Sequence, residues 1–128
     1  MLMPYLRYDD APRALKFLVE AFGFEVVMDH RDDAGKVGHA ELRLAGDWIS
    51  LSSVLEGGVP MKTPRQLGGV PMGLYFVIDD PDAHFARATA AGMEVVRAPE
   101  TQSYGGRDYT VRDPEGFFWS FGTYRPTV

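Results

Sequence analysis

The sequence predicts an α+β fold built from two tandem copies of one strand–helix–strand–strand–strand module. Three pairs of similar segments recur at an offset of 69 or 70 residues. They are YLRYDD at 5–10 and YFVIDD at 75–80, GFEVV at 23–27 and GMEVV at 92–96, and GDWISL at 46–51 and GFFWSF at 116–121. Solenoid units recur every ~20–50 residues, so this longer period indicates a duplicated supersecondary module.

The first module is expected over residues 1–53. A short strand ends in two aspartates, Asp9 and Asp10, whose carboxylates suit the start of a helix. Apolar residues at helical spacing continue the helix to Gly23, which ends it. The strands are expected at 5–8, 25–30, 37–44 and 48–53.

The second module is expected over residues 71–128 and follows a linker, 54–70, that is rich in Gly and Pro. This linker is long enough to fold over another part of the chain. In the second module we expect a helix at 81–91 and strands at 73–78, 94–98, 107–112 and 117–124, with a turn at Asp113-Pro114-Glu115-Gly116.

Length and composition favour one globular domain, 1–128, and exclude several classes of protein. A chain of 128 residues with 45% hydrophobic residues is long enough to bury a core. The net charge of -5 argues against nucleic acid or an anionic membrane as a partner. The chain has no apolar run long enough to cross a membrane, and its N-terminal residues give no reason to expect export. It has no cysteine, so disulfides and thiolate chemistry are excluded, and the simplest expectation is a cytoplasmic protein.

Strand alternation separates two faces in each module. Ile49, Leu51, Phe76, Trp119 and Phe121 fall on apolar faces, which should pack on the helices. The opposite faces mix aromatic, charged and small side chains. They form either a solvated sheet surface or the lining of a cleft, and we favour a cleft because large aromatic residues are unusual on a bare sheet.

The opening strand–Asp-Asp–helix with AFGFEVV, its later copy AAGMEVV, and the closing DPEGFFWSFGTY resemble the vicinal oxygen chelate superfamily. That superfamily includes glyoxalase I, fosfomycin-resistance enzymes, extradiol dioxygenases and bleomycin-binding resistance proteins. The resemblance covers nearly the whole chain. It implies two βαβββ modules that form a curved mixed sheet around a cleft, with the helices on the convex face, and it implies a homodimer.

The resemblance also implies where a catalytic divalent metal would bind. In this chain the family's ligand positions fall at Met3, Ser50, Gly73 and Ser120, none of which is His, Asp or Glu. Such a metal needs imidazole or carboxylate ligands. We therefore predict no metal and no cofactor.

Several side chains in the predicted cleft have two interpretations. His39 and Glu41 are either an acid–base or metal pair or, as we favour, an ion pair on an edge strand with Arg43 or another neighbour. Trp48 and Phe118 are equivalent in the two copies and are either core aromatics or a sandwich for a flat ligand. We expect His84 on the solvated face of its helix. Tyr104 is either a lid or a surface residue.

Two functions follow from these alternatives. The first is a metal-free binder that sequesters an aromatic small molecule such as an antibiotic, with Trp48 as the anchor and Arg7 and Arg43 for anionic groups. The second is an enzyme of the glyoxalase or dioxygenase type with an atypical metal or an acid–base site. We favour the binder, with the ligand contacted by Tyr5, Arg7, His39, Glu41, Arg43, Trp48, Ser50, Ser52, Tyr75, Tyr104, Phe118 and Ser120.

Overall fold

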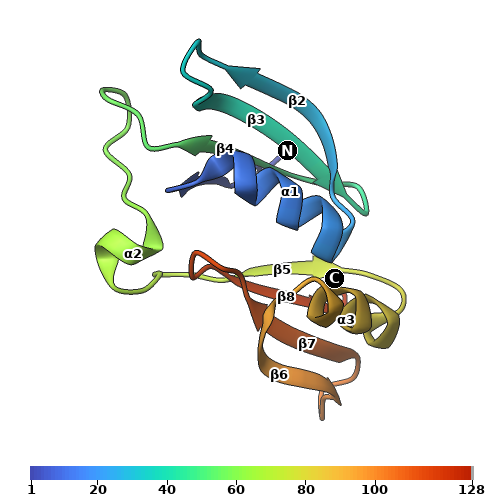
Figure 1. Cartoon of the computed structure of the whole chain (residues 1–128). Coiled ribbons are helices and arrows are strands. Elements are labelled where there is room, and N and C mark those ends of the chain that lie inside the picture. The colour runs from blue at the N-terminus through green and yellow to red at the C-terminus, as the bar shows by residue number, and fades with distance from the viewer. Residues whose placement is uncertain (128) are drawn as a thin grey trace.

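The computed structural model describes residues 1–127 and contains two four-stranded mixed sheets and three helices (Figure 1). The strand orders are β1-β4-β3-β2 and β5-β8-β7-β6, so the second module repeats the topology of the first. The predicted α+β class and the duplicated βαβββ modules are thereby confirmed. The elements are β1 Tyr5–Tyr8, α1 Ala11–Phe22, β2 Glu25–Arg31, β3 Val37–Leu44, β4 Asp47–Ser53, α2 Pro64–Leu67, β5 Leu74–Val77, α3 Pro81–Ala90, β6 Glu94–Thr101, β7 Arg107–Arg112 and β8 Phe118–Gly122.

Each module forms its own four-stranded mixed sheet. Strands β1 and β5 each form one edge of their sheet, and each pairs in parallel with the last strand of its own module. In Figure 1, β5 is the strand of the second sheet that lies nearest to the first. Residues of both strands line the same cavity between the modules.

Equivalent residues begin the two long helices. The side chains of Asp10 and Asp80 each accept a hydrogen bond of 3.1 Å from a backbone N–H in the first turn, that of Arg13 and that of Ala83. These bonds satisfy one of the backbone donors that every helix start leaves free. Helix α1 ends at Gly23, whose φ of 84° is in the left-handed region that glycine adopts readily.

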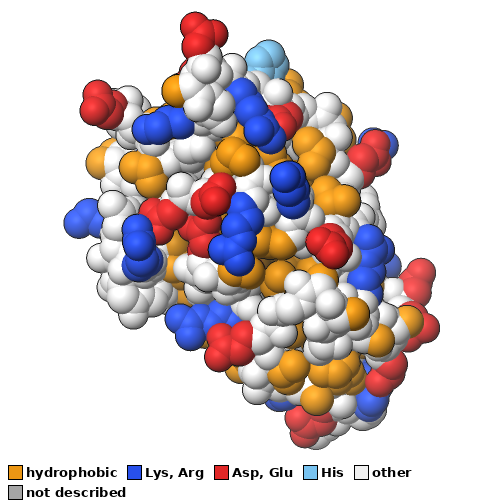
Figure 2. Space-filling view, in the orientation of Figure 1, with side chains coloured by type: hydrophobic (Ala, Val, Ile, Leu, Met, Phe, Trp, Pro, Cys, Tyr) orange, Lys and Arg blue, Asp and Glu red, His pale blue; other side chains and the backbone are white. Residues whose placement is uncertain are grey.

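The predicted apolar faces form one core with the helices. Ile49, Leu51, Phe76, Trp119 and Phe121 are all buried, as expected. Helices α1 and α3 pack against each other near the centre of the molecule (Figure 1). On the face seen in Figure 2, acidic and basic side chains are interspersed rather than gathered by sign.

Helix α1 also reaches the second sheet, through the aromatic ring of Phe22. That ring lies 5.4 Å from the Trp119 ring and 4.8 Å from the Phe121 ring, measured between centroids. Phe17 and Ala21 lie off the main apolar stripe of α1, a position that could serve contact with a partner chain. Both are buried within the chain, and the Phe17 ring packs on Tyr8.

The linker contains a short helix that the sequence analysis did not predict. Thr63 caps α2: its backbone N–H donates to the Gln66 side chain, and its hydroxyl accepts from the Gln66 backbone N–H. Pro64 at the first helical position is buried. The linker is therefore held at a defined place. Among residues 1–127, no helix has both the length and the apolar character needed to cross a bilayer.

The turn before β8 binds the two modules together through its two acids. The buried Asp113 carboxylate accepts hydrogen bonds from the Tyr8 hydroxyl, at 2.7 Å, and from the Trp119 indole N–H, at 2.9 Å. Glu115 accepts the backbone N–H groups of Asp9 and Asp10 at the end of β1. The turn thus fixes the end of β1 against the start of β8.

Candidate ligand-binding site

Polar side chains of the first module share one face of its sheet. Strand pairing sets Tyr5 beside Ser50, Arg7 beside Ser52, and Glu41 on the other side of Ser50. The expected common face therefore exists, although Ser50 is itself buried. The predicted residues on this face are Tyr5, Arg7, His39, Glu41, Arg43, Trp48, Ser50 and Ser52.

The equivalent aromatic residues of the two modules are each covered by an arginine. The Arg43 guanidinium lies 5.7 Å from the centre of the Trp48 ring and also pairs with Glu25, with Nε and Oε2 2.8 Å apart. In the second module, Arg112 lies 5.6 Å from the centre of the Phe118 ring. A cation over an aromatic face is attractive. Each ring therefore has a partner within its own module.

His39 and Glu41 form a pair with each other, with Nε2 and Oε2 3.1 Å apart. Arg43 is engaged with Glu25 instead. Strand β3 lies inside its sheet, whose edges are β1 and β2, so our expectation of an edge strand was wrong. Both members of the pair are partly solvated. This geometry is that of a surface ion pair, which contributes little to stability.

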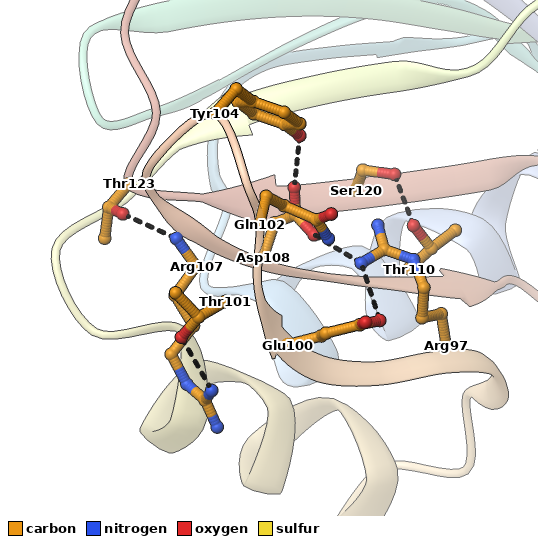
Figure 3. Close-up of polar contacts among 10 residues, drawn as sticks. All are labelled: Arg97, Glu100, Thr101, Gln102, Tyr104, Arg107, Asp108, Thr110, Ser120 and Thr123. Carbon is orange, nitrogen blue, oxygen red and sulfur yellow. Dashed lines mark hydrogen bonds and ion pairs between the residues drawn. The ribbon is translucent and has the colours of Figure 1, made fainter.

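The polar face of the second sheet carries a hydrogen-bonded cluster around Asp108 (Figure 3). The buried Asp108 carboxylate is bound by the side chains of Arg97, Gln102 and Tyr104. Burial opposes the ionisation of Asp108, but the hydrogen bonds from Arg97 and Gln102 outweigh it, and the pKa of the carboxyl is lowered. Asp108 is therefore an ionised acceptor whose oxygens already bind donors of the protein itself.

Gly122 allows this cluster to pack closely. A Cβ atom at this position would lie 2.5 Å from the Asp108 Cβ and 2.9 Å from the Arg107 carbonyl oxygen. An open hollow beside this cluster brings together three of the predicted ligand contacts, Tyr75, Tyr104 and Ser120. Tyr75 donates to the Tyr124 carbonyl, and Ser120 shares a 2.7 Å hydrogen bond with Thr110.

A largely apolar cavity of about 520 Å³ lies at the junction of the modules. Its walls come from β1 and the residues before it, the linker with α2, and the starts of β5 and β8. Ligand pockets for small molecules usually measure ~300–1,000 Å³ and are mostly apolar, so this cavity has the size and lining of a binding site. It is lined by Leu2, Met3, Pro4, Tyr5, Leu6, Arg7, Met61, Lys62, Pro64, Leu67, Val70, Pro71, Met72, Leu74, Phe117 and Phe118.

The cavity combines three predicted ligand contacts, Tyr5, Arg7 and Phe118, from two modules. Trp48, which we expected to be the anchor, is not among its lining residues, whereas its equivalent Phe118 is. The linker side chains that close the cavity, such as Met61 and Leu67, were not among the predicted ligand contacts. Large apolar residues in an otherwise Gly- and Pro-rich connection were the available signal.

Arg7 is an unusual residue in this lining. It lies in β1, and the residue is only 8% exposed. The Nε atom is buried and has no hydrogen-bond partner in the part of the chain that the structure describes. Most buried polar groups in proteins are hydrogen-bonded, so this atom is an exception that needs an explanation.

The metal positions implied by the family pattern do not offer a suitable donor set. They hold a thioether at Met3, hydroxyls at Ser50 and Ser120, and no side chain at Gly73. Within residues 1–127, no three His, Asp or Glu side chains converge as metal ligands would. The residues therefore do not fit a catalytic divalent metal of this family.

His84 is half-buried at the interface of the modules, so our expectation of a solvated position was wrong. Its ring nitrogens contact the Tyr109 hydroxyl and the Phe22 carbonyl, the latter at 2.8 Å. Burial is the main cause that lowers the pKa of His84. The residue thus acts in packing, by joining α3 to the end of α1.

Comparisons with known proteins agree with the fold. A sequence model of the Glyoxalase/Bleomycin resistance protein/Dioxygenase superfamily matches residues 2–121. The uncharacterized protein Mb0911c of Mycobacterium bovis is 40% identical over 124 residues, covering 94% of this chain and 81% of that protein.

Two crystal structures are similar over nearly their whole length. TioX from Micromonospora sp. ML1 has a TM-score of 0.76 and 29% identity, over 97% of this chain and 98% of that one. A glyoxalase/bleomycin resistance protein from Streptomyces sp. CB03234 has a TM-score of 0.72 and 26% identity, over 94% and 97% of the two chains.

Proposed function

Because this chain belongs to the glyoxalase/bleomycin resistance protein/dioxygenase superfamily, we propose that it is a small-molecule-binding protein that sequesters an aromatic ligand, such as an antibiotic, without transforming it. The site is the cavity at the module junction. The observation that carries this proposal is an apolar cavity of about 520 Å³ with aromatic side chains, Tyr5 and Phe118, at walls from different modules. A flat apolar molecule buried there gains from the hydrophobic effect and from contact with the rings.

The chemistry of the site favours binding over catalysis. The four positions where the family holds its metal lack suitable ligands in this chain. The His39–Glu41 pair is not among the residues that line the junction cavity. A cavity that binds a ligand tightly in its ground state does not by that binding accelerate a reaction. Sequestration needs only such binding. One divalent metal ion per purified chain would argue for the enzymatic alternative.

Phe118 is the proposed anchor, and Trp48 is the matched control because it holds the equivalent place in the other module. Aromatic anchors in desolvated pockets commonly contribute ~2 kcal/mol or more. The probe is the neutral fluorescent dye anilinonaphthalene. Phe118→Ala should raise its Kd by at least about tenfold, since a factor of ten corresponds to ~1.4 kcal/mol, and Trp48→Ala should change it much less.

The opposite result would refute this assignment. If Trp48→Ala weakens dye binding while Phe118→Ala does not, the ligand lies on the polar face of the first sheet. If neither variant changes the Kd, the dye does not report on either aromatic residue, and the aromatic-anchor proposal is wrong. Circular dichroism of each variant checks that both retain the native fold.

We also propose that the protein is a homodimer, as the family pattern implies. Support comes from apolar side chains exposed around the cavity, of which Leu2 is 90%, Leu67 55% and Met72 64% exposed. Exposed apolar patches commonly mark contact surfaces. Sedimentation should give twice the chain mass of 14.2 kDa, and a monomer at micromolar concentration would contradict the proposal.

A further inference from the structure

Arg7 places a cation in the wall of an otherwise apolar cavity. Arg7 is more than nine-tenths buried as a whole residue, and its buried Nε atom has no hydrogen-bond partner among the described residues. Burying an unpaired charge is costly, and buried charges in proteins are normally paired. Arg7 lies in the short strand β1, beside Ser52 of β4.

No Asp or Glu of residues 1–127 lines the cavity, so its lining does not neutralise this charge. The lining includes a second cation, Lys62. Other arginines of the chain have carboxylate partners: Arg43 pairs with Glu25, and Arg97 with Asp108. Of the two arginines that we expected to meet anionic groups, Arg43 is thus engaged, whereas Arg7 has no carboxylate partner within residues 1–127.

We infer that the ligand of this cavity is an aromatic or apolar monoanion, whose carboxylate or comparable acidic group binds Arg7. This inference rests on the proposed function and narrows its ligand class. A guanidinium presents two parallel N–H donors that match a carboxylate. The apolar surroundings strengthen that pair, since they lower the local dielectric constant. The remaining lining would hold the flat apolar body of the ligand.

The test compares two dyes that differ in one group. Anilinonaphthalene is neutral, and anilinonaphthalene sulfonate carries one negative charge on the same ring system. Arg7→Met keeps an unbranched apolar side chain but removes the charge. It should raise the Kd of the sulfonate by at least about tenfold, as expected for the loss of a charged hydrogen bond, while the Kd of the neutral dye changes by less than about twofold.

Two controls sharpen this comparison. Lys62→Met removes the other cation of the cavity, which is exposed, and should affect sulfonate binding far less than Arg7→Met. Arg7→Lys keeps the charge without the planar fork and should fall between the wild type and Arg7→Met. Thermal unfolding and near-ultraviolet circular dichroism check the fold of each variant.

If Arg7→Met does not fold, the unaltered protein still decides the question. Naphthoate is an anion, and naphthamide is its neutral analogue. Naphthoate should displace bound anilinonaphthalene at a concentration at least about ten times lower than naphthamide does, because one charged hydrogen bond is worth about that factor in affinity. Equal displacement, or sulfonate binding that is unchanged in Arg7→Met, would overturn the inference while leaving the proposed aromatic site intact. Failure of the proposed function has a different signature, because then Phe118→Ala would leave binding of the neutral dye unchanged.

Discussion

The Tyr8 hydroxyl of the first module donates a hydrogen bond of 2.7 Å to the Asp113 carboxylate of the second. Both residues are buried. Tyr8 ends β1, and the turn that contains Asp113 leads into β8, so this bond holds together two walls of the junction cavity. Burial raises the pKa of Asp113, an effect that the hydrogen bonds from Trp119 and Tyr8 oppose.

Removing the Tyr8 hydroxyl should therefore loosen the module junction. Tyr8→Phe leaves a buried carboxylate with one donor fewer, and we expect a loss of ~1–3 kcal/mol of unfolding free energy. Urea denaturation measures it. Tyr5→Phe is the control because Tyr5 is 53% exposed and its hydroxyl should contribute little. Equal stability of the two variants would show that the bond to Asp113 is not important for folding.

Trp119 and Trp48 should differ sharply in their contribution to stability. Trp119 is fully buried, packs on Phe22 and Phe76, and donates to Asp113. Trp119→Ala should cost ~3–5 kcal/mol, the usual range for a large aromatic core residue, and Trp48→Ala should cost clearly less. Trp119→Phe removes the indole N–H together with one of the two fused rings, and it should cost less than Trp119→Ala because a phenyl ring remains in the core. If Trp48→Ala unfolds the protein while Trp119→Ala is tolerated, the two faces of the sheets have been assigned in reverse.

Stability should fall in mild acid because of His84. Its pKa in the folded protein is lowered, chiefly by burial, whereas an unfolded histidine titrates near ~6.5. As the pH falls through this range the unfolded chain binds a proton first, so the unfolding free energy decreases. His84→Gln should reduce the loss of stability between about pH 7.5 and pH 5.5, the range around the histidine pKa.

His30→Gln is the control for this prediction, since His30 is exposed on β2. It should retain the pH dependence of the wild type. An unchanged pH dependence in His84→Gln, measured by urea denaturation at each pH, would mean that other groups account for the acid sensitivity.

Local chemistry made much of the fold predictable. Alternation along the strands placed Phe76, Trp119 and Phe121 correctly in the core, and the paired aspartates located both helix starts. The repeat also identified equivalent residues, such as Trp48 and Phe118, which the structure shows under equivalent arginines. These features depend on neighbours in sequence or on one sheet, so their patterns are visible in the chain.

The rest depended on contacts between the modules. The linker has no second copy, so the repeat could not reveal that it lines a cavity with Phe118 rather than with Trp48. His84 follows the helix periodicity of a partly exposed position, but α1 brings the Phe22 carbonyl to it from far along the chain. Arg7 likewise lies on a polar strand face, and its burial arises only in the folded chain.

The most direct test of the central claim, an aromatic ligand in the junction cavity, uses the methionines as reporters. Met3, Met61 and Met72 line the cavity, whereas Met28 and Met93 are not among its lining residues. Nuclear magnetic resonance of protein with labelled methionine methyl groups, titrated with anilinonaphthalene, should show saturable shifts of the first three signals, since an aromatic ring shifts the nuclei beside it. Shifts confined to Met28 or Met93, or no saturable shift of Met3, Met61 and Met72, would contradict the assignment of this cavity as the binding site.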